Sequence, residues 1–316
     1  MHNILPRVTV SVIFSLFILL QTGCMTTPEE KIIKTFKPSK TFLYSPTVRI
    51  NFEKHGSGPV NLILIHGFGS SIRTWDDVMR LLKQHKMLKH FTVYIPDMKG
   101  AGFSSKPDDK HYSIRDNAEI LAAFIKKYKI EHPVLTGHSL GGGIALYATV
   151  SYLKGNYYPS HLILADCACY PTDFPFFVKF LRIPVMNEFI LKVLPDRFRT
   201  NETMKRVIVN RKKITPELRA RYIYMHKLPG YANALIETAK NIIPDDIDAL
   251  TSGYTAIKCP VDIIWGSEDT ILPLDLGVKL HKTAPDSSLT ILPGIGHDVP
   301  EEDPAAITGM IEKTVK

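Results

Sequence analysis

Short apolar runs that alternate with helical patterns define the class of fold open to this chain. Most of these runs are continuous stretches rich in Val, Ile and Leu, which is typical of strands covered on both faces. They lie at residues 61–65, 92–95, 134–136, 161–165, 261–265 and 288–292. Their alternation with helical patterns predicts crossover connections, and therefore an α/β protein with a mainly parallel sheet flanked by helices. Ligands of such sheets bind beyond the carboxyl ends of the strands, so residues directly after these runs are candidates for a functional site.

Two further regions set the expected domain boundaries. Residues 41–44 and 48–54 have an extended pattern and are followed by turn residues, which predicts a leading hairpin. Residues 170–227 carry no strand signal, only short helical patterns interrupted by prolines. We therefore expect a helical cap over residues 170–227, inserted into a core formed by residues 41–169 and 228–316.

The expected cap carries the excess positive charge of the chain. It holds thirteen Lys and Arg against five Asp and Glu, whereas the whole chain has 39 against 31. Such a basic cap is compatible with a solvated surface, with contact to anionic lipid headgroups, or with attraction of anionic substrates. Because the basic residues form no recognisable nucleic-acid-binding module, we expect no nucleic-acid partner.

Residues 1–24 differ from the rest of the chain and predict export. A positively charged start precedes an apolar run at residues 8–20, which is too short to span a bilayer but typical of a secretory signal. The sequence Leu-Gln-Thr-Gly-Cys that ends at Cys24 resembles a bacterial lipobox, although Gln21 stands where Leu is usual. This resemblance implies a lipid-anchored protein that faces the periplasm or the cell exterior, with a simple secretion signal or an uncleaved anchor as the alternative. The polar residues 25–40 are expected to form a linker to the membrane.

A candidate nucleophile lies between an apolar run and a helical pattern. The pentapeptide Gly-His-Ser-Leu-Gly, centred on Ser139, follows the run at 134–136 and precedes a helical pattern. A strand, a sharp turn and a helix form the context of a nucleophile elbow, in which Gly137 and Gly141 let neighbouring backbone pass closely. Such a turn exposes the serine hydroxyl at the helix N-terminus, where developing negative charge is stabilised.

These motifs resemble those of the α/β-hydrolase superfamily from about Asn51 to the end of the chain. The sequence His-Gly-Phe-Gly at 66–69 follows an apolar run, as the His-Gly loop of the superfamily does. Residues 96–104 are similar to its Pro-Asp-x-Arg-Gly-x-Gly-x-Ser stretch, with Lys99 in place of the usual Arg. In its serine at the elbow the chain resembles the esterases, lipases, peptidases and carbon–carbon hydrolases of the superfamily. Haloalkane dehalogenases and epoxide hydrolases carry Asp at this position. The resemblance implies an α/β-hydrolase fold with an inserted helical cap.

The resemblance also implies which residues assist Ser139. A histidine is expected after the last strand, and His297 follows the run that ends at residue 292. Asp269, in the loop after the preceding strand, is the leading candidate for the acid that orients this histidine. Asp166 also ends a strand and is the second candidate, and Glu268 is a weaker one.

The expected chemistry is acyl transfer without a metal or organic cofactor. Ser139 attacks a carbonyl, His297 moves the protons, and the backbone N–H groups of Phe68 and Leu140 stabilise the oxyanion. The leading expectation is a carboxylic ester hydrolase of the esterase or lipase kind that acts on a small-molecule ester or lipid. The apolar stretch at 174–194 is expected to form an acyl-chain pocket, with ordinary core packing as the alternative. A carbon–carbon hydrolase with the same triad and a ligand-binding protein without activity stay open.

Overall fold

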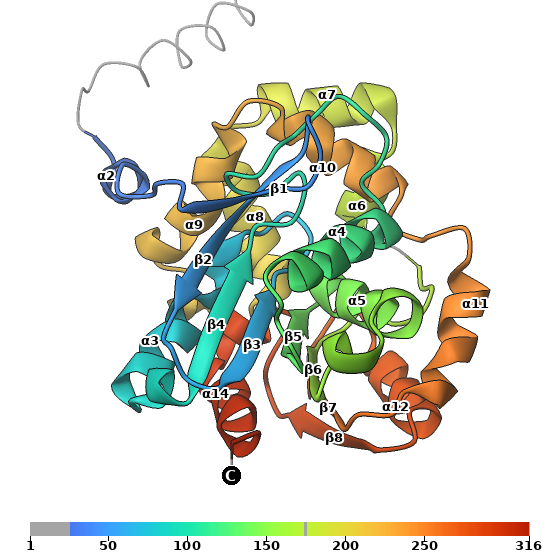
Figure 1. Ribbon diagram of the computed structural model, residues 1–316. Helices are drawn as coiled ribbons and strands as arrows, with labels where there is room; N and C mark the ends of the chain where they lie inside the picture. The colour runs from blue at the N-terminus through green and yellow to red at the C-terminus, as the bar shows by residue number, and fades with distance from the viewer. Residues whose placement is uncertain (1–25, 174–175, 316) are drawn as a thin grey trace, which may run out of the picture.

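An eight-stranded sheet forms the centre of the molecule (Figure 1). Its strands lie side by side in the order β1-β2-β4-β3-β5-β6-β7-β8. Their bounds are β1 Lys40–Leu43, β2 Arg49–His55, β3 Val60–Ile65, β4 Phe91–Pro96, β5 Val134–His138, β6 His161–Ala165, β7 Val261–Gly266 and β8 Ser287–Leu292. The pairs β1–β2 and β2–β4 are antiparallel, and the remaining five pairs are parallel. The expected leading hairpin and mainly parallel sheet are confirmed.

The structure is a computed structural model that describes residues 26–173 and 176–315. The expected signal over residues 1–24 and the candidate lipidation site Cys24 lie outside the described residues. None of the helices in the described ranges is long and apolar enough to span a bilayer.

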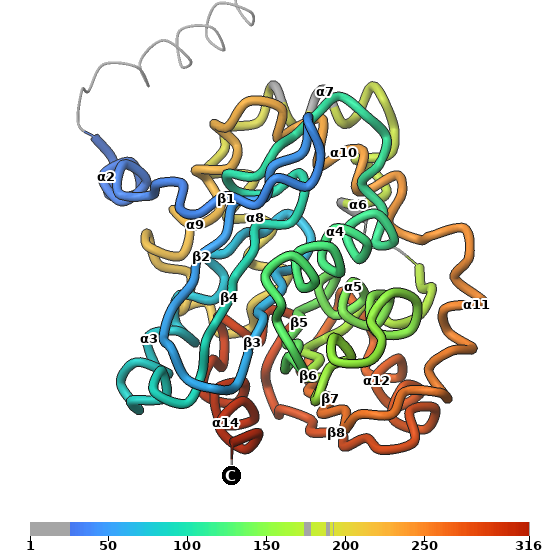
Figure 2. Tube along the Cα trace, in the orientation of Figure 1, coloured from blue at the N-terminus to red at the C-terminus, as the bar shows by residue number. Residues whose placement is uncertain are grey.

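Helices cover both faces of the sheet, which explains why its central strands are apolar throughout (Figures 1 and 2). The helices α4 (Ile114–Lys127), α5 (Leu140–Tyr147) and α12 (Leu274–Thr283) pack on one face, and α3 (Asp76–Gln84) and α14 (Pro304–Lys313) pack on the other.

Strand β3 shows the two-sided burial most clearly. Ile63 and Ile65 belong to the core under α4 and α5, whereas Leu62 and Leu64 belong to the core under α3 and α14. All four side chains are fully buried. Alternate residues of a strand point to opposite faces, so a strand with helices on both sides requires apolar side chains at every position.

A long helical region connects β6 to β7 and covers the carboxyl ends of the strands (Figure 1). It contains α6 (Phe176–Leu181), α7 (Pro184–Val193), α8 (Asp196–Val207), α9 (Pro216–His226), α10 (Tyr231–Lys240) and α11 (Ile247–Ser252). The expected cap ended at residue 227, but α10 packs against α6 and α9. The helices above the sheet therefore continue past that boundary, because the chain turns at Gly230, with φ 78°, directly into a further helix.

The expected linker over residues 25–40 is in part a helix docked on the cap. Helix α2 (Pro28–Ile33) packs against α9. Its buried Glu29 forms an ion pair with Arg219 of α9 at 2.8 Å. Ile33 contributes to an apolar cluster that also contains Phe103 and Tyr224. The linker interpretation is wrong over this helix, because these contacts fix it to the cap.

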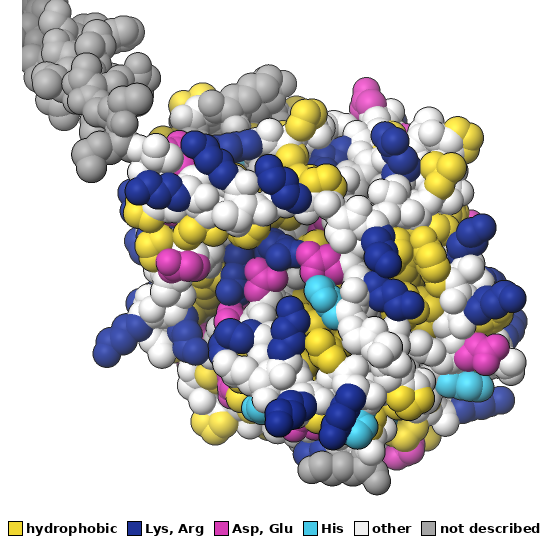
Figure 3. Space-filling view, turned by 60° about the vertical axis from the view of Figure 1, so that its left-hand side comes forward, with side chains coloured by type: hydrophobic (Ala, Val, Ile, Leu, Met, Phe, Trp, Pro, Cys, Tyr) yellow, Lys and Arg dark blue, Asp and Glu magenta, His cyan; other side chains and the backbone are white. Residues whose placement is uncertain are grey.

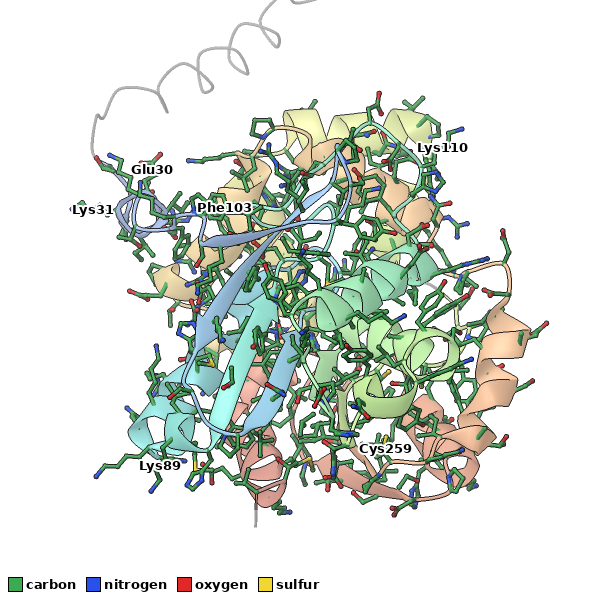
Figure 4. The ribbon with its side chains drawn as sticks, viewed as in Figure 1. Glu30, Lys31, Lys89, Phe103, Lys110 and Cys259 are labelled. Atoms are coloured by element: carbon green, nitrogen blue, oxygen red, sulfur yellow. The ribbon has the colours of Figure 1, made fainter. Side chains whose placement is uncertain are left out.

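Helix α2 is capped at its start and packs with one side only. Thr27 and Glu30 form a reciprocal capping box, with each side chain accepting a hydrogen bond from the backbone N–H of the other. Glu30 and Lys31 lie at the edge of the molecule in Figure 4, whereas Phe103 lies on the inner side of the helix, in the cluster with Ile33 and Tyr224. The helix is therefore solvent-exposed on one side and packed on the other.

Candidate active site

The sharp turn between β5 and α5 holds Ser139 in a strained conformation. Its φ is 53° and its ψ is −119°, which costs roughly 1–3 kcal/mol for a residue with a side chain. Two glycines make the turn possible. A Cβ at Gly137 would lie 2.5 Å from the carbonyl oxygen of Gly141, and a Cβ at Gly141 would lie 2.2 Å from that of Ile65. The turn thus presents the serine side chain at the carboxyl end of the sheet, at the start of a helix.

His297 lies in the loop after β8 and contacts the serine directly. Its Nε2 is 2.9 Å from the Oγ of Ser139. Its Nδ1 is 2.7 Å from Oδ2 of Asp269, which follows β7. The three side chains thus form a continuous hydrogen-bonded chain, although Ser139 and His297 are 158 positions apart in sequence. This geometry lets His297 accept the serine proton while Asp269 fixes the orientation of the ring.

The second oxygen of Asp269 is held by backbone groups. Its Oδ1 accepts hydrogen bonds from the N–H groups of Ile271 at 2.7 Å and Leu272 at 2.9 Å. The carboxylate is therefore fixed at both oxygens, and its side chain is fully buried. The start of the loop after β7 thus provides a rigid support for the histidine.

Asp166, the second candidate for the acid, lies beside Asp269 but does not contact the histidine in a hydrogen bond. It directly follows β6 and is fully buried, and its Oδ1 accepts from the N–H of Gly266 at 2.9 Å. The three side chains of Asp166, Asp269 and His297 are close together: one polar atom from each lies within 4.8 Å of the other two. Burial, followed by the negative charge of Asp269, raises the pKa of Asp166 well above its ordinary value. We infer that Asp166 is a neutral carboxylic acid behind the Asp269 carboxylate.

The loop after β3 approaches the serine from the other side. A Cβ at Gly67 would lie 3.2 Å from the Cβ of Ser139, so the loop passes directly over the nucleophile. His66 braces this loop, because its Nε2 accepts from the N–H of Met98 at 3.0 Å and its Nδ1 donates to the Gly67 carbonyl at 2.9 Å. Burial lowers the pKa of His66, which favours this neutral form. The loop is therefore held in place by a neutral histidine, and Phe68 follows Gly67 in it.

The expected oxyanion donors are the backbone N–H groups of Phe68 and Leu140. Phe68 belongs to the loop over the nucleophile, and Leu140 begins α5 directly after Ser139. Among the described residues, neither N–H group makes a hydrogen bond. Two free donors beside the nucleophile are able to stabilise an oxyanion at the attacked carbonyl.

A cavity of about 240 Å³ opens above Ser139 and His297, and most of its wall is apolar. The apolar stretch expected to form an acyl-chain pocket contributes four described residues to it: Val178, Leu181, Ile190 and Leu191. The stretch is not wholly directed inward, because Ile183 is 47% exposed and Val185 is 80% exposed. The side chains of Phe174, Phe176, Phe177 and Phe189 lie outside the description.

A buried carboxylate that the sequence did not single out ties the cap to the histidine loop. Glu302 accepts hydrogen bonds from the N–H of Gly296 at 3.0 Å and, across the interface, from those of Val209 at 3.0 Å and Asn210 at 2.6 Å. The backbone adds a further bond from the N–H of Asp298 to the carbonyl of Val207 at 3.1 Å. We call these four bonds the Glu302 latch. In the sequence, the only indication of this contact was the acidic run at 301–303, shortly after His297.

A second buried acidic group lies next to the latch. The Tyr222 hydroxyl on α9 is 3.1 Å from Oδ2 of Asp298 and 2.9 Å from Oε2 of Glu301. Burial, followed by the negative charge of Asp298, raises the pKa of Glu301 well above its usual range. The raised pKa favours the neutral form of Glu301, and the neighbouring Asp298 lines the cavity.

Comparison with known proteins gives consistent matches over most of the chain. A family model described as alpha/beta hydrolase fold matches residues 60–304. A protein of Bacillus subtilis named as an uncharacterized hydrolase is 25% identical over 271 residues, which cover 85% of this chain and 95% of its own. The 2-hydroxymuconate semialdehyde hydrolase of a Pseudomonas strain is 24% identical over 267 residues, 84% of this chain and 89% of its own. The solved structure of a thermophilic esterase from Thermogutta terrifontis is similar with a TM-score of 0.68 and 25% identity, covering 89% of this chain and 98% of that chain.

Proposed function

The chain belongs to the α/β-hydrolase-fold family, and on this basis we propose that it is a serine hydrolase that cleaves carboxylic esters. The observation that carries the proposal is the hydrogen-bonded chain from Ser139 through His297 to Asp269, with contacts of 2.9 and 2.7 Å. The mainly apolar cavity above it supports an ester with an apolar part.

The proposed mechanism follows from this geometry. His297 accepts the proton of the Ser139 hydroxyl as the oxygen attacks the ester carbonyl, and the N–H groups of Phe68 and Leu140 stabilise the oxyanion. His297 then protonates the departing alcohol, which leaves an acyl group on the serine. A water molecule, activated by the same histidine, attacks this acyl-enzyme and releases the acid. The steps need only residues of this chain and water.

A carbon–carbon hydrolase is the second candidate function. It is supported by the similarity to the 2-hydroxymuconate semialdehyde hydrolase, which aligns over 84% of this chain. The same triad serves such a reaction, so the catalytic residues do not discriminate between the two functions.

Labelling with a fluorophosphonate probe tests for a working nucleophile. We expect the protein to be labelled, Ser139→Ala to lose the label, and the control Ser160→Ala, at an exposed serine, to retain it. A series of p-nitrophenyl esters of increasing acyl length then tests the reaction. Labelling without turnover of any ester would exclude the preferred function, and absence of labelling would favour a ligand-binding protein.

We also propose that the protein is exported and anchored to a membrane through a lipid on Cys24. The support is the lipobox-like sequence; Cys24 also precedes α2 by four residues, and α2 packs against α9 of the cap. Metabolic labelling with a fatty acid is expected to mark the wild type and not Cys24→Ala. Recovery of both forms in the membrane fraction, without label, would instead indicate an uncleaved apolar anchor.

A further inference from the structure

The outer side of the cap carries exposed apolar side chains next to Lys and Arg. Val193, the last residue of α7, is 61% exposed, and Phe198, near the start of α8, is 53% exposed. Arg197, Lys205 and Arg206 of α8 are exposed as well. We call these five residues the cap corner. In Figure 3 apolar and basic side chains lie side by side over the upper part of the molecule, where the cap lies.

Helix α8 turns its other side to the cavity. Phe198 and Lys205 are seven residues apart, which is two turns of a helix, so they lie on one face. Thr200 and Met204 lie on the opposite face, are 4% and 2% exposed and line the cavity. Packing inside the molecule therefore accounts for Thr200 and Met204, but not for Phe198, which presents a large apolar side chain to the outside.

The N-terminal helix holds the cap corner close to the proposed anchor. Cys24 precedes Thr26, where the described chain begins, by two residues, which reach at most about 7 Å. Helix α2 follows at Pro28, and Oε1 of its Glu29 lies 3.4 Å from Nε of Arg197 on α8. In Figure 1, α2 and α7 lie toward the same end of the molecule, and β8 lies at the opposite end. A lipid on Cys24 would therefore hold the cap corner, and not the sheet edge, next to the membrane.

The surroundings of the cap corner are positively charged. Residues 196–213 hold seven Lys and Arg against two acidic residues. Glu29 pairs with both Arg197 and Arg219, so one carboxylate faces two cations. Among the described residues, Arg206 forms no ion pair with an acidic side chain. Anionic lipid head groups attract such a surface, and apolar side chains beside the cations enter the boundary between head groups and acyl chains.

We propose that the cap corner docks on the surface of an anionic lipid bilayer, with Val193 and Phe198 in the interface and the cations of α8 at the head groups. The proposal rests on the proposed membrane anchor and goes beyond ester hydrolysis. An anchored chain meets the bilayer at a high effective concentration, so contacts that are individually weak suffice to dock it. Because α8 also lines the cavity above Ser139, docking brings the active site close to the lipid.

Tryptophan fluorescence tests the docking, because the two native tryptophans, Trp75 and Trp265, are fully buried. The full-length protein is reconstituted in vesicles of brominated phosphatidylcholine, with or without phosphatidylglycerol. The added emission of Phe198→Trp is expected to shift to shorter wavelength and to be quenched in the anionic vesicles only. Ile291→Trp is the matched control, at an exposed position of β8 at the opposite end of the molecule in Figure 1, and is expected to show neither effect. Quenching of both variants, or of neither, would overturn the proposal.

Charge reversal in the Phe198→Trp background tests the attraction to the head groups. Lys205→Glu combined with Arg206→Glu is expected to lower the ratio of docked to undocked protein more than about tenfold, since each cation near an anionic surface contributes roughly fivefold. Lys258→Glu combined with Lys282→Glu changes the net charge equally at exposed positions and is expected to leave the ratio unchanged. Lys258 is next to Cys259, which lies at the lower end of the molecule in Figure 4. An equal loss in both pairs would overturn the assignment to the cap corner.

A second copy of the chain is the alternative occupant of the cap corner. Concentration-dependent dimerisation that Phe198→Ser abolishes, without quenching by lipid, would assign the surface to that copy and overturn the proposal. Turnover of a soluble p-nitrophenyl ester in the same preparations reports the proposed hydrolysis separately, and fatty-acid labelling at Cys24 reports the anchor. Full turnover without quenching would refute the docking alone, whereas quenching without turnover would support the docking and refute the proposed hydrolysis.

Discussion

At the residue scale, two buried carboxyl groups lie side by side behind the histidine, and only one of them contacts it. Asp269 has its oxygens fixed by His297 and by two backbone N–H groups. Asp166 is instead held by one backbone N–H and has a raised pKa. Burial and the neighbouring carboxyl group thus favour the neutral form of Asp166, and Asp269 is the acid that contacts the histidine.

Substitution of each aspartate by asparagine separates their roles. Asp269→Asn is expected to lower kcat for a p-nitrophenyl ester about 10³- to 10⁴-fold, because the amide no longer stabilises the imidazolium. Asp166→Asn is expected to lower it less than tenfold, because asparagine resembles the neutral acid already present. Steady-state kinetics at pH 8 measure both effects. A larger loss in Asp166→Asn would exchange the assigned roles.

His138 predicts a pH dependence of stability. Burial is the main cause that lowers its pKa to about 4, while its Nε2 donates to the His297 carbonyl at 2.9 Å. Between pH 6.5 and 4 the unfolded chain binds a proton at this histidine and the folded protein does not, so stability falls as the pH falls. This single group accounts for up to about 3 kcal/mol over that window. Urea unfolding from pH 4.5 to 7 is expected to show a flatter profile for His138→Gln than for the wild type, and parallel profiles would contradict this assignment.

At the element scale, the loop that carries His297 is joined to the cap by the Glu302 latch. Glu302→Gln places an NH₂ group among three N–H donors and is expected to destabilise the fold by about 2–4 kcal/mol. It is also expected to lower kcat about tenfold, because the loop is less firmly held.

Glu301→Gln is the matched control for the latch. Glu301 is next to Glu302 in sequence, and its raised pKa favours a neutral carboxyl group, which a glutamine amide resembles. It is expected to change kcat by less than threefold. Because the raised pKa makes the wild type lose stability as the pH rises, Glu301→Gln should gain stability relative to the wild type from pH 5 to 8. Thermal and urea unfolding of the two variants measure the stability effects, and steady-state kinetics measure kcat. Equal destabilisation by both variants would show that the bonds of Glu302 do not hold the loop more firmly than Glu301 does.

The elements that the sequence predicted well are those fixed by burial alone. The parallel strands are apolar on both faces, and the turn at Ser139 has glycines where neighbouring backbone leaves no room for a side chain. Helix α2 was not predicted, because its position depends on Arg219, which is far away in sequence. The choice between Asp166 and Asp269 also depended on three-dimensional placement, since both residues lie just beyond the carboxyl ends of two neighbouring strands.

At the scale of the whole molecule, α2 connects the N-terminal region to the cap. Glu29→Ala breaks a buried ion pair and is expected to cost about 3–5 kcal/mol. Hydrogen exchange should increase in α2 and α9 together, with little change in kcat, because neither helix supplies a residue of the triad. Lys31→Ala, at an exposed position of α2, is the control. Faster exchange confined to α2 would show that the cap does not depend on this contact.

The long separation of Ser139 and His297 has a consequence for the order in which the site is made. During synthesis the elbow leaves the ribosome first, and more than a hundred further residues follow before its histidine emerges. The strand that precedes the histidine, β8, is the last of the sheet and pairs only with β7. A chain whose final strand has not yet docked therefore lacks the base that the proposed mechanism requires, and the triad is complete only once β8 has paired with β7.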